Sequence, residues 1–384
     1  MRFAVDAHAI GRHLTGNEVY VRSLLNGFAA LDRESEFITY LSMDEVEAWV
    51  PSRFPVRRIA GNPFVRLGCD FALKLRRDRP ELLHVQYTAP LGCPVPVVVS
   101  VHDVSFLEHP DYFPFHRAMQ LRLTVQHTIR KAARILTGSE FSRDSIARAY
   151  HLDPDRIAVV PNAAADCFHP VRRDTALAQV RERFGIAAPF VLSVGDLQPR
   201  KNHVGLIEAF GRLVQAHPHL PHQLILAGKE TWFGRRVHEA AEDSGVADRI
   251  RFLGFVSDDD LLHLYNACEL FCFPSFYEGF GLPVLEAMAC GAAVACSNTS
   301  AVPEVADGAA LLFNPYNADE ITRAMLDLIL HAELRSRMCR LGLQRATHFS
   351  WQKTAQETLD VYYDVLERRQ PVEARAVSAS ISEQ

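Results

Sequence analysis

The chain has 384 residues, of which 48% are hydrophobic and 23% charged, and its net charge is −5 at pH 7. This length exceeds one ordinary domain and predicts two, and the composition excludes a disordered chain. The negative charge argues against general nucleic-acid binding, so no nucleic-acid partner is expected.

The N-terminal residues, MRFAVDAHAI, run straight into an apolar strand. They lack the basic flank, apolar core and cleavage site of a signal peptide. The longest apolar runs, such as VPVVVSV at 95–101, are far shorter than the roughly 20 residues that span a bilayer. We therefore expect a cytoplasmic protein without a transmembrane helix.

Eight cysteines occur without a CxxC pair, mostly within apolar strings such as LFCFP. This usage is typical of buried, reduced thiols. The alternative is a metal site formed by Cys268, Cys272, Cys290 and Cys296.

Short apolar runs alternate with helix-period segments along the chain, which is typical of α/β folds with parallel sheets covered by helices. In the first half, strands are predicted at RFAVDA, FITYLS, LLHVQ, VPVVVSVHD, ARILTGS and IAVVPN, and helices at 18–31 and 142–150. A linker is predicted at 169–179, before a helix resumes at VRERFG. In the second half, strands are predicted at FVLSVG, QLILAG, IRFLGF, LFCFPS, AAVACSN and AALLFNP.

The stretch FPSFYEGFGLPVLEAMACG at 273–291 combines two acids with a glycine turn. It predicts a strand that ends near Ser275, a loop with Glu278, and a helix that starts at Pro283. The N-terminus of this helix is an anion site, while Glu286 is placed to accept hydrogen bonds from a diol such as ribose. Diol, phosphate and a second polyol at Glu278 together describe a nucleotide sugar. The alternative is a glycine-rich turn with two solvated acids.

A second feature is SVGDLQPRKNHVGLIEAF, where Arg200 and Lys201 directly precede a helix capped by Asn202. Cations at a helix N-terminus oppose the helix dipole unless an anion lies between them and the helix. A diphosphate would resolve this conflict. The alternative is two surface charges in a loop.

The pair PRKN and EGFGLPVLEAMACG, with its acids in an E-x7-E pattern, resembles the family 4 retaining glycosyltransferases of the GT-B fold. The resemblance covers most of the chain, including FLGFVSDDDLLHLYNACELFCFPS, SAVPEVADGAALLFNP and FSWQKTAQETL, and more loosely TGNEVYVRSLL, HVQYTAPL, VHDVSFLEHPDYF, LTGSEFSRDSI and VVPNA. It implies two Rossmann-like, doubly wound domains that face each other across a cleft. We expect an acceptor-binding domain at 1–170, a nucleotide-sugar-binding domain at 171–350, a helix at 351–369 that crosses back to the first domain, and a disordered tail at 370–384.

The resemblance also implies roles for individual residues. Arg200 and Lys201 would bind the donor diphosphate and stabilise the leaving group, Glu278 would hold the transferred sugar, and Glu286 would hold the ribose. His102 matches a first-domain residue beside the donor sugar and acceptor; its alternative is a structural hydrogen bond at a strand end. The other implied donor-binding residues are Gly16, Gly195, Phe255, Val256, Gly279, Phe280, Gly281, Leu282 and Pro283.

One departure from the family lies near the start, where the chain reads LTGNEVYVRSLL. Gly16 keeps the tight turn before the helix. Asn17 and Glu18 stand where family members have small or basic residues, and Glu18 is a candidate for contact with acceptor hydroxyls.

Retention in this family is ascribed to a front-face path in which the leaving diphosphate assists deprotonation of the acceptor hydroxyl. No enzymatic nucleophile is then required, and the chain has no G-x-S-x-G elbow. Asp258, Asp259 and Asp260 (SDDDLL) are interpreted as a helix start, with a metal site as the alternative. We expect no cofactor and no metal, because Arg200 and Lys201 would supply the positive charge.

The segment 115–136 contains five basic residues and no acid. They are Arg117, Arg122, Arg130, Lys131 and Arg134. Such a helix can lie on an anionic membrane, which would suit a lipid-linked acceptor. The alternative is a solvated helix face.

The expected function is transfer of a hexose from a nucleotide sugar to a hydroxyl of a glycan or lipid-linked glycan in polysaccharide biosynthesis. Similarity to a mannosyltransferase branch around VHDVSFLEHP favours mannose from GDP-mannose, followed by UDP-sugars. The alternatives are a nucleotide-sugar epimerase of the same fold and a non-catalytic nucleotide-sugar-binding protein. An NAD-dependent dehydrogenase would need a G-x-G-x-x-G turn, which is absent.

Overall fold

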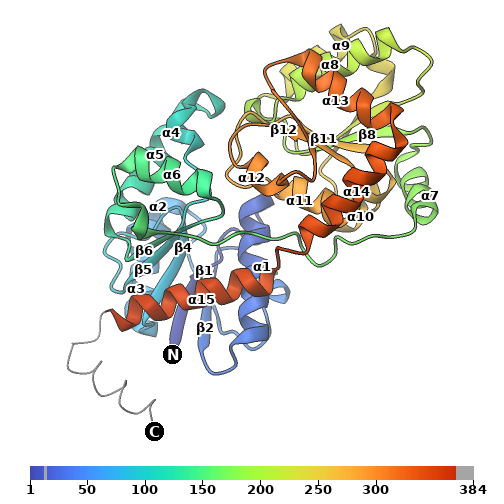
Figure 1. Ribbon diagram of the computed structural model, residues 1–384. Helices are drawn as coiled ribbons and strands as arrows, with labels where there is room; N and C mark the ends of the chain where they lie inside the picture. Colours follow the sequence, from blue (N-terminus) through green and yellow to red (C-terminus); the bar gives the residue numbers. More distant parts are fainter. Residues whose placement is uncertain (13–14, 369–384) are drawn as a thin grey trace. The chain divides into compact units, whose positions relative to one another are not determined.

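The computed structural model describes residues 1–12 and 15–368, which form two compact units (Figure 1). The first unit comprises Met1–Gly138, Arg143–Asn162 and the chain from Trp351 onward. The second comprises Ser139–Ser142 and Ala163–Ser350. Each unit is built around one parallel sheet.

The first sheet has seven strands in the order β3-β2-β1-β4-β5-β6-β7. Parallel strands covered by helices are continuous apolar runs, and Phe3, Ala4 and Val5 of β1 are accordingly all buried. The strands are β1 (Arg2–Asp6), β2 (Glu36–Leu41), β3 (Val56–Arg58), β4 (Leu82–Gln86), β5 (Val97–Ser100), β6 (Arg134–Thr137) and β7 (Ile157–Val159).

Helices or helical turns connect most of these parallel strands, which need crossover connections, whereas β4 passes to β5 without a helix. The α-helices up to β7 are α1 (Thr15–Leu31), α2 (Pro63–Val65), α3 (Phe71–Asp78), α4 (Ser105–Glu108), α5 (Phe115–Lys131) and α6 (Glu140–Tyr150). Shorter helical turns are η1 (Glu47–Trp49), η2 (Arg66–Asp70), η3 (Pro110–Tyr112) and η4 (Pro154–Arg156).

The second sheet has six strands in the order β10-β9-β8-β11-β12-β13. They are β8 (Phe190–Val194), β9 (Gln223–Ala227), β10 (Ile250–Gly254), β11 (Leu270–Phe273), β12 (Val294–Ser297) and β13 (Leu311–Phe313). The helices of this unit are α7 (Arg173–Phe184), α8 (His203–Ala216), α9 (Gly234–Asp243), α10 (Asp258–Ala267), α11 (Leu282–Ala289), α12 (Val302–Ala306), α13 (Ala318–Leu330) and α14 (Ala332–Ala346), with turns η5 (Pro199–Lys201) and η6 (Ala247–Arg249).

All twelve predicted strands are present, but β3 has no counterpart among them. It contains only the residues VRR and forms the edge of its sheet. Arg57 is exposed and neither neighbour is fully buried. Without an apolar run, the sequence offers no strand signal at this position.

The predicted linker at 169–179 is wrong in its second part, because α7 begins at Arg173. Ala176 and Val180 are the residues of α7 that are buried. So narrow an apolar stripe produces little helical periodicity in the sequence.

The last helix, α15 (Trp351–Glu367), belongs to the first unit and packs along α1 (Figure 1). A Cβ built on Gly27 of α1 would lie 2.5 Å from the Cβ of Ala355, so glycine permits this close approach. Tyr362 is buried, and its hydroxyl lies 2.5 Å from Nδ1 of His84 on β4. The predicted tail at 370–384 lies outside the described residues.

All eight cysteines are unpaired, and Cys268, Cys272, Cys290 and Cys296 are buried. Burial raises the pKa of these thiols, which keeps them protonated. Within residues 1–12 and 15–368, no group of three or more His, Cys, Asp or Glu residues is placed to hold a metal ion. No helix of the same residues is both long and apolar enough to cross a bilayer.

Candidate functional site

The strand order of the second sheet reverses at β8, which pairs with β9 on one side and with β11 on the other. Ligands of open parallel sheets bind outside the carboxyl ends of the strands at such a point. The loop after β8 carries Gly195, Arg200 and Lys201, and the loop after β11 carries Glu278. These predicted site residues therefore lie on the two loops that flank this point.

Glu278 forms ion pairs with both predicted cations. Its Oε2 lies 2.8 Å from Nη1 of Arg200, and its Oε1 lies 2.7 Å from Nζ of Lys201. The side chains of Lys201 and Glu278 are each 9% exposed, and that of Arg200 is 21% exposed. Two cations thus share one carboxylate in this nearly buried cluster, and Asp196 also acts electrostatically on Lys201.

The members of the cluster shift each other's pKa values. Burial raises the pKa of the Glu278 carboxyl, but Arg200 and Lys201 outweigh burial and hold this pKa at about 2. Burial lowers the pKa of Lys201, an effect that Glu278 opposes. A Cβ at Gly195 would lie 3.0 Å from Cδ of Lys201, so glycine leaves room for the lysine stem.

Asn202 caps α8, as the sequence predicts. Its side chain accepts a hydrogen bond from the N–H of Gly205 at 3.2 Å, and its φ of 54° lies in the left-handed region that asparagine tolerates. The anion beside Arg200 and Lys201 in this structure is the carboxylate of Glu278. The charge conflict at the start of α8 is thus resolved within the chain.

The loop that carries Glu278 passes into α11 at Gly281. The φ of Gly281 is 104°, a left-handed conformation that favours glycine. Leu282 is the first helical residue, one position before the predicted start, and Pro283 follows in the first turn. Gly279 and Phe280 are buried in the preceding loop. The predicted phosphate-binding residues therefore stand at a helix N-terminus, where backbone N–H groups lack partners within the helix.

Glu286 is buried in α11 and has a different partner. The hydroxyl of Tyr265, on α10, donates a hydrogen bond to its Oε2 at 3.0 Å. Burial raises the pKa of Glu286 to about 7, which the Tyr265 hydrogen bond and Lys201 oppose and Asp258 reinforces. The charge of Lys201 lowers the pKa of both Glu278 and Glu286, so the two acids lie near the same cation.

Phe255 and Val256 follow β10 and differ in exposure. The ring of Phe255 is 58% exposed, and Nζ of Lys229 lies 5.4 Å from its centroid. Val256 is buried in the apolar core. Phe255 therefore offers a ring face that a base could contact, whereas Val256 packs the unit. Beside them, Asp258–Asp260 form the first turn of α10, capped by Ser257, as the sequence predicts.

The remaining predicted residues, Gly16 and His102, belong to the first unit. The predicted turn at Gly16 is wrong, because α1 begins at Thr15 and Gly16 lies exposed in its first turn. Glu18 is buried, and its Oε1 accepts a hydrogen bond from the N–H of Gly11 at 3.2 Å. His102 follows β5, and its Nε2 lies 3.0 Å from Oε1 of Gln86. Burial lowers the pKa of His102 to about 4, so the imidazole is neutral at pH 7.

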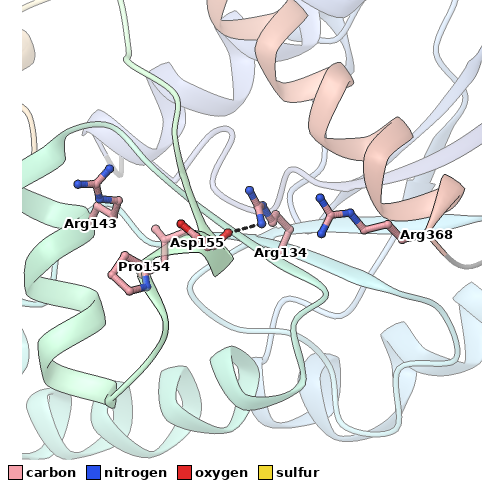
Figure 2. A pocket seen from close by; sticks show the side chains of 6 residues that line it. Arg134, Arg143, Pro154, Asp155 and Arg368 are labelled. Atoms are coloured by element: carbon pink, nitrogen blue, oxygen red, sulfur yellow. Dashed lines mark hydrogen bonds between the residues drawn. The ribbon is translucent and has the colours of Figure 1, made fainter.

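A cavity of about 370 Å³ also lies in the first unit (Figure 2). It is lined by Arg134, Arg143, Pro154, Asp155, Ile157 and Arg368. Arg134 donates a hydrogen bond to the backbone oxygen of Asp155. Arg134 and Ile157 begin β6 and β7, so this cavity reaches the amino edge of the sheet, whereas His102 follows the carboxyl end of β5.

Residues 179–345 match the family Glycosyl transferases group 1, and residues 14–165 match Glycosyltransferase Family 4. The chain is 35% identical over 266 residues to O-antigen chain mannosyltransferase B of Escherichia coli, an alignment that covers 69% of each protein. The chain belongs to the family 4 glycosyltransferases.

Two further comparisons define the extent of the likeness. The chain is 32% identical over 251 residues to the serotype-specific mannosyltransferase WbdA of Escherichia coli, which is 64% of this chain and 30% of that longer protein. The crystal structure of Anabaena Alr3699/HepE in complex with UDP-glucose matches with a TM-score of 0.76 at 20% identity, over 95% of this chain and 100% of that chain. The predicted GT-B fold of this glycosyltransferase is confirmed.

Tyr265 and Gln86, which contact Glu286 and His102, are not predicted from the sequence. Tyr265 lies on the buried side of α10, where an aromatic residue is typical of an ordinary core position. Gln86 ends an apolar strand, and its position after LLHV is the only signal that the sequence contains.

Proposed function

We propose that this glycosyltransferase transfers mannose from GDP-mannose, with retained anomeric configuration, to a hydroxyl of a growing glycan. The observation that carries the proposal is the nearly buried cluster of Arg200, Lys201 and Glu278, which places two cations beside the N-terminus of α11. The similarity to an O-antigen chain mannosyltransferase and to the mannosyltransferase WbdA supports mannose as the sugar and polysaccharide biosynthesis as the process.

The proposed reaction breaks the bond between the anomeric carbon and the diphosphate oxygen, so negative charge grows on the diphosphate. Arg200 and Lys201 stabilise this charge in a nearly buried setting, where electrostatic interactions are stronger than in water. The acceptor oxygen bonds to the same face of the sugar, and its proton passes to a phosphate oxygen. These two cations take the part that a divalent metal takes in other enzymes, so the proposal includes neither a metal nor a cofactor.

The two acids have different proposed roles. Glu278 is fully ionised at pH 7 and accepts hydrogen bonds from hydroxyls of the transferred sugar while it keeps Arg200 and Lys201 in place. Glu286 accepts hydrogen bonds from the ribose hydroxyls, and Phe255 borders the base.

A direct test is ligand-observed NMR with GDP-mannose, UDP-glucose and UDP-N-acetylglucosamine, followed by product analysis by mass spectrometry with and without acceptor glycans. We expect GDP-mannose to bind and Arg200→Ala to weaken binding at least tenfold, the loss of about one charge-assisted hydrogen bond. Arg235→Ala is the matched control, because this side chain is 90% exposed and pairs only with Glu239 in the same helix. Conversion of GDP-mannose, without an acceptor, into an epimeric GDP-sugar of the same mass, detected by NMR, would instead identify an epimerase.

We further propose that the acceptor is lipid-linked and that the enzyme works peripherally at the cytoplasmic face of a membrane, through α5. Its residues Phe115, Met119 and Leu123 recur every four positions and are 80%, 39% and 61% exposed. Exposed Arg122 and Arg130 lie on the same helix. An apolar row with adjacent cations is the pattern of a helix that lies on an anionic surface.

Sedimentation with anionic and neutral vesicles tests this docking surface. We expect binding to anionic vesicles that weakens with salt, and a clear loss of binding in Phe115→Ser/Leu123→Ser. Trp232→Ser is the matched control, since Trp232 is 57% exposed in the second unit. Equal sedimentation of all variants would assign α5 to the alternative of a solvated helix face.

A further inference from the structure

Gln86, the last residue of β4, lies between two hydrogen-bonding partners in the first unit. Its Nε2 donates to the backbone oxygen of Asn17, on α1, at 3.1 Å. Its Oε1 lies 3.0 Å from Nε2 of His102. Gln86 is 6% exposed, and its partners Asn17 and His102 are half-buried.

The partner on α1 fixes the orientation of the Gln86 amide. The two ends of a glutamine amide differ in that the nitrogen can only donate and the oxygen can only accept. The backbone oxygen of Asn17 can only accept, so it requires the amide nitrogen. The amide oxygen must then face His102.

The orientation of this amide in turn fixes the proton on His102. An amide oxygen can only accept, so Nε2 of His102 must donate the hydrogen bond. A neutral imidazole carries one proton, and burial keeps this ring neutral at pH 7. The proton is therefore on Nε2, and Nδ1 carries a lone pair.

Two aromatic rings further constrain the imidazole. The ring of Tyr20 meets it edge to face at a centroid distance of 4.7 Å, and the ring of Tyr87 does so at 5.7 Å. Tyr87 has a φ of 59°, which is uncommon for a bulky residue and marks a backbone held by its surroundings. The local fold thus maintains a strained residue that contacts His102.

We propose that Gln86 is a positioning residue of the glycosyl transfer, which holds His102 in the tautomer with the proton on Nε2 and the lone pair on Nδ1. A hydrogen bond between Nδ1 and a substrate hydroxyl is then accepted by the ring and never donated by it. The consequence for catalysis rests on the proposed function, whereas the tautomer itself is a property of the ligand-free protein.

The tautomer is measured by long-range ¹H–¹⁵N NMR of histidine-labelled protein at pH 7. The chain has 17 histidines, so the His102 signals are assigned by their loss in His102→Gln. We expect a single tautomer with Nε2 protonated in the unsubstituted protein. In Gln86→Leu, which removes the acceptor, we expect the ¹⁵N shifts to move toward the average of the two tautomers.

The pH dependence provides a second measurement that a merely structural role would not change. In Gln86→Glu, a carboxylate faces Nε2, so the pKa of His102 should rise from about 4. The titratable groups that face the ring include Tyr20, Tyr87, His84 and Asp103. If neutral His102 is required, the acid limb of the pH–rate profile moves to higher pH in the same variant.

Steady-state kinetics then connect the tautomer to the reaction. We expect Gln86→Leu to lower kcat by on the order of tenfold, the usual effect of losing a group that orients a functional histidine, with little change in the KM for GDP-mannose. Gln356→Leu is the matched control, because Gln356 is exposed on α15 and bonds only to Asp360. Circular dichroism and thermal unfolding of each variant establish that it is folded.

The outcomes separate this inference from the proposed function. Absence of mannosyl transfer by the unsubstituted protein would refute the proposed function and leave the tautomer measurement intact. A proton on Nδ1, or a single unchanged tautomer in Gln86→Leu, would overturn the role of Gln86. An active enzyme whose kcat is unchanged in Gln86→Leu would do the same.

Discussion

Glu278 and Glu286 are buried acids of the same loop and helix, but their carboxyl groups have opposite environments. Glu278 lies between a guanidinium and an ammonium group, which hold its pKa at about 2. Glu286 accepts a hydrogen bond from a tyrosine hydroxyl, and burial raises its pKa to about 7. Burial is similar for both, so the partners decide which acid is permanently charged and which titrates near neutral pH.

Removal of the Glu278 charge is expected to have the largest effect. Glu278→Gln removes the carboxylate that pairs with both Arg200 and Lys201 in a nearly buried site, which should lower the free energy of unfolding by about 4 kcal/mol at pH 7. The difference from the unsubstituted protein should be complete above pH 4.5, the ordinary pKa of Glu, and should disappear as the pH falls toward 2. Urea denaturation over this pH range measures both quantities.

Glu208→Gln is the control for this substitution. Glu208 also pairs with an arginine, Arg212, but its side chain is 55% exposed. Exposed pairs contribute at most about 1 kcal/mol. Equal unfolding energies for the two variants would show that the Glu278 cluster is no stronger than a surface pair.

Neutralisation of Glu286 should have the opposite pH dependence. Its stabilising contribution is complete below pH 4.5 and is lost as the pH rises through about 7. The unsubstituted protein should therefore lose up to about 3 kcal/mol of unfolding free energy, relative to Glu286→Gln, between pH 4.5 and 8. Urea denaturation of both proteins at several pH values measures this difference. The same pH dependence of the unfolding free energy in both proteins would contradict it.

Ionisation of Glu286 should lower the free energy of unfolding but increase the affinity for the donor. If the ionised carboxylate binds the ribose, affinity for GDP-mannose should increase as the pH rises toward 7, by up to tenfold per pH unit. In Glu286→Gln the affinity should be low and independent of pH. Calorimetric titration at several pH values separates these cases.

Loss of the tyrosine hydroxyl should have the smallest effect. Tyr265→Phe removes the hydrogen bond that lowers the pKa of Glu286, so this pKa should rise above 7. The free energy of unfolding should fall by about 1 kcal/mol, the usual value for one hydrogen bond. Tyr316→Phe is the control, because Tyr316 is 66% exposed. If the pH midpoint of donor binding is the same in Tyr265→Phe as in the unsubstituted protein, Tyr265 does not lower the pKa of Glu286.

The sequence predicts the sheets because buried parallel strands are apolar along their whole length. It fails at β3, where pairing depends on the edge strand's backbone and Arg57 faces solvent. It fails at the start of α7 for a related reason, since two buried residues are too few to produce a helical pattern. Elements that are stabilised by neighbours rather than by their own apolar face leave little signal in the sequence.

The same reasoning applies to the candidate site. Arg200, Lys201, Glu278 and Glu286 are predicted because each lies beside a loop or helix start with a local signature. The ion pair between Lys201 and Glu278 joins residues 77 positions apart, and the bond from Tyr265 joins two helices. Such contacts depend on the tertiary fold, so the sequence alone does not reveal that Glu278 neutralises part of the cation pair.

The packing of α15 on α1 determines when each unit can complete its fold during synthesis. Most of the second unit is one continuous segment, Ala163–Ser350, whereas the first unit requires the helix that begins at Trp351. Until that helix leaves the ribosome, His84 lacks Tyr362 and the contact of Gly27 with Ala355 is missing. Domains usually fold in the order of their synthesis; here the N-terminal unit completes its core last, and a nascent chain stalled before residue 351 would leave one face of α1 open to chaperones.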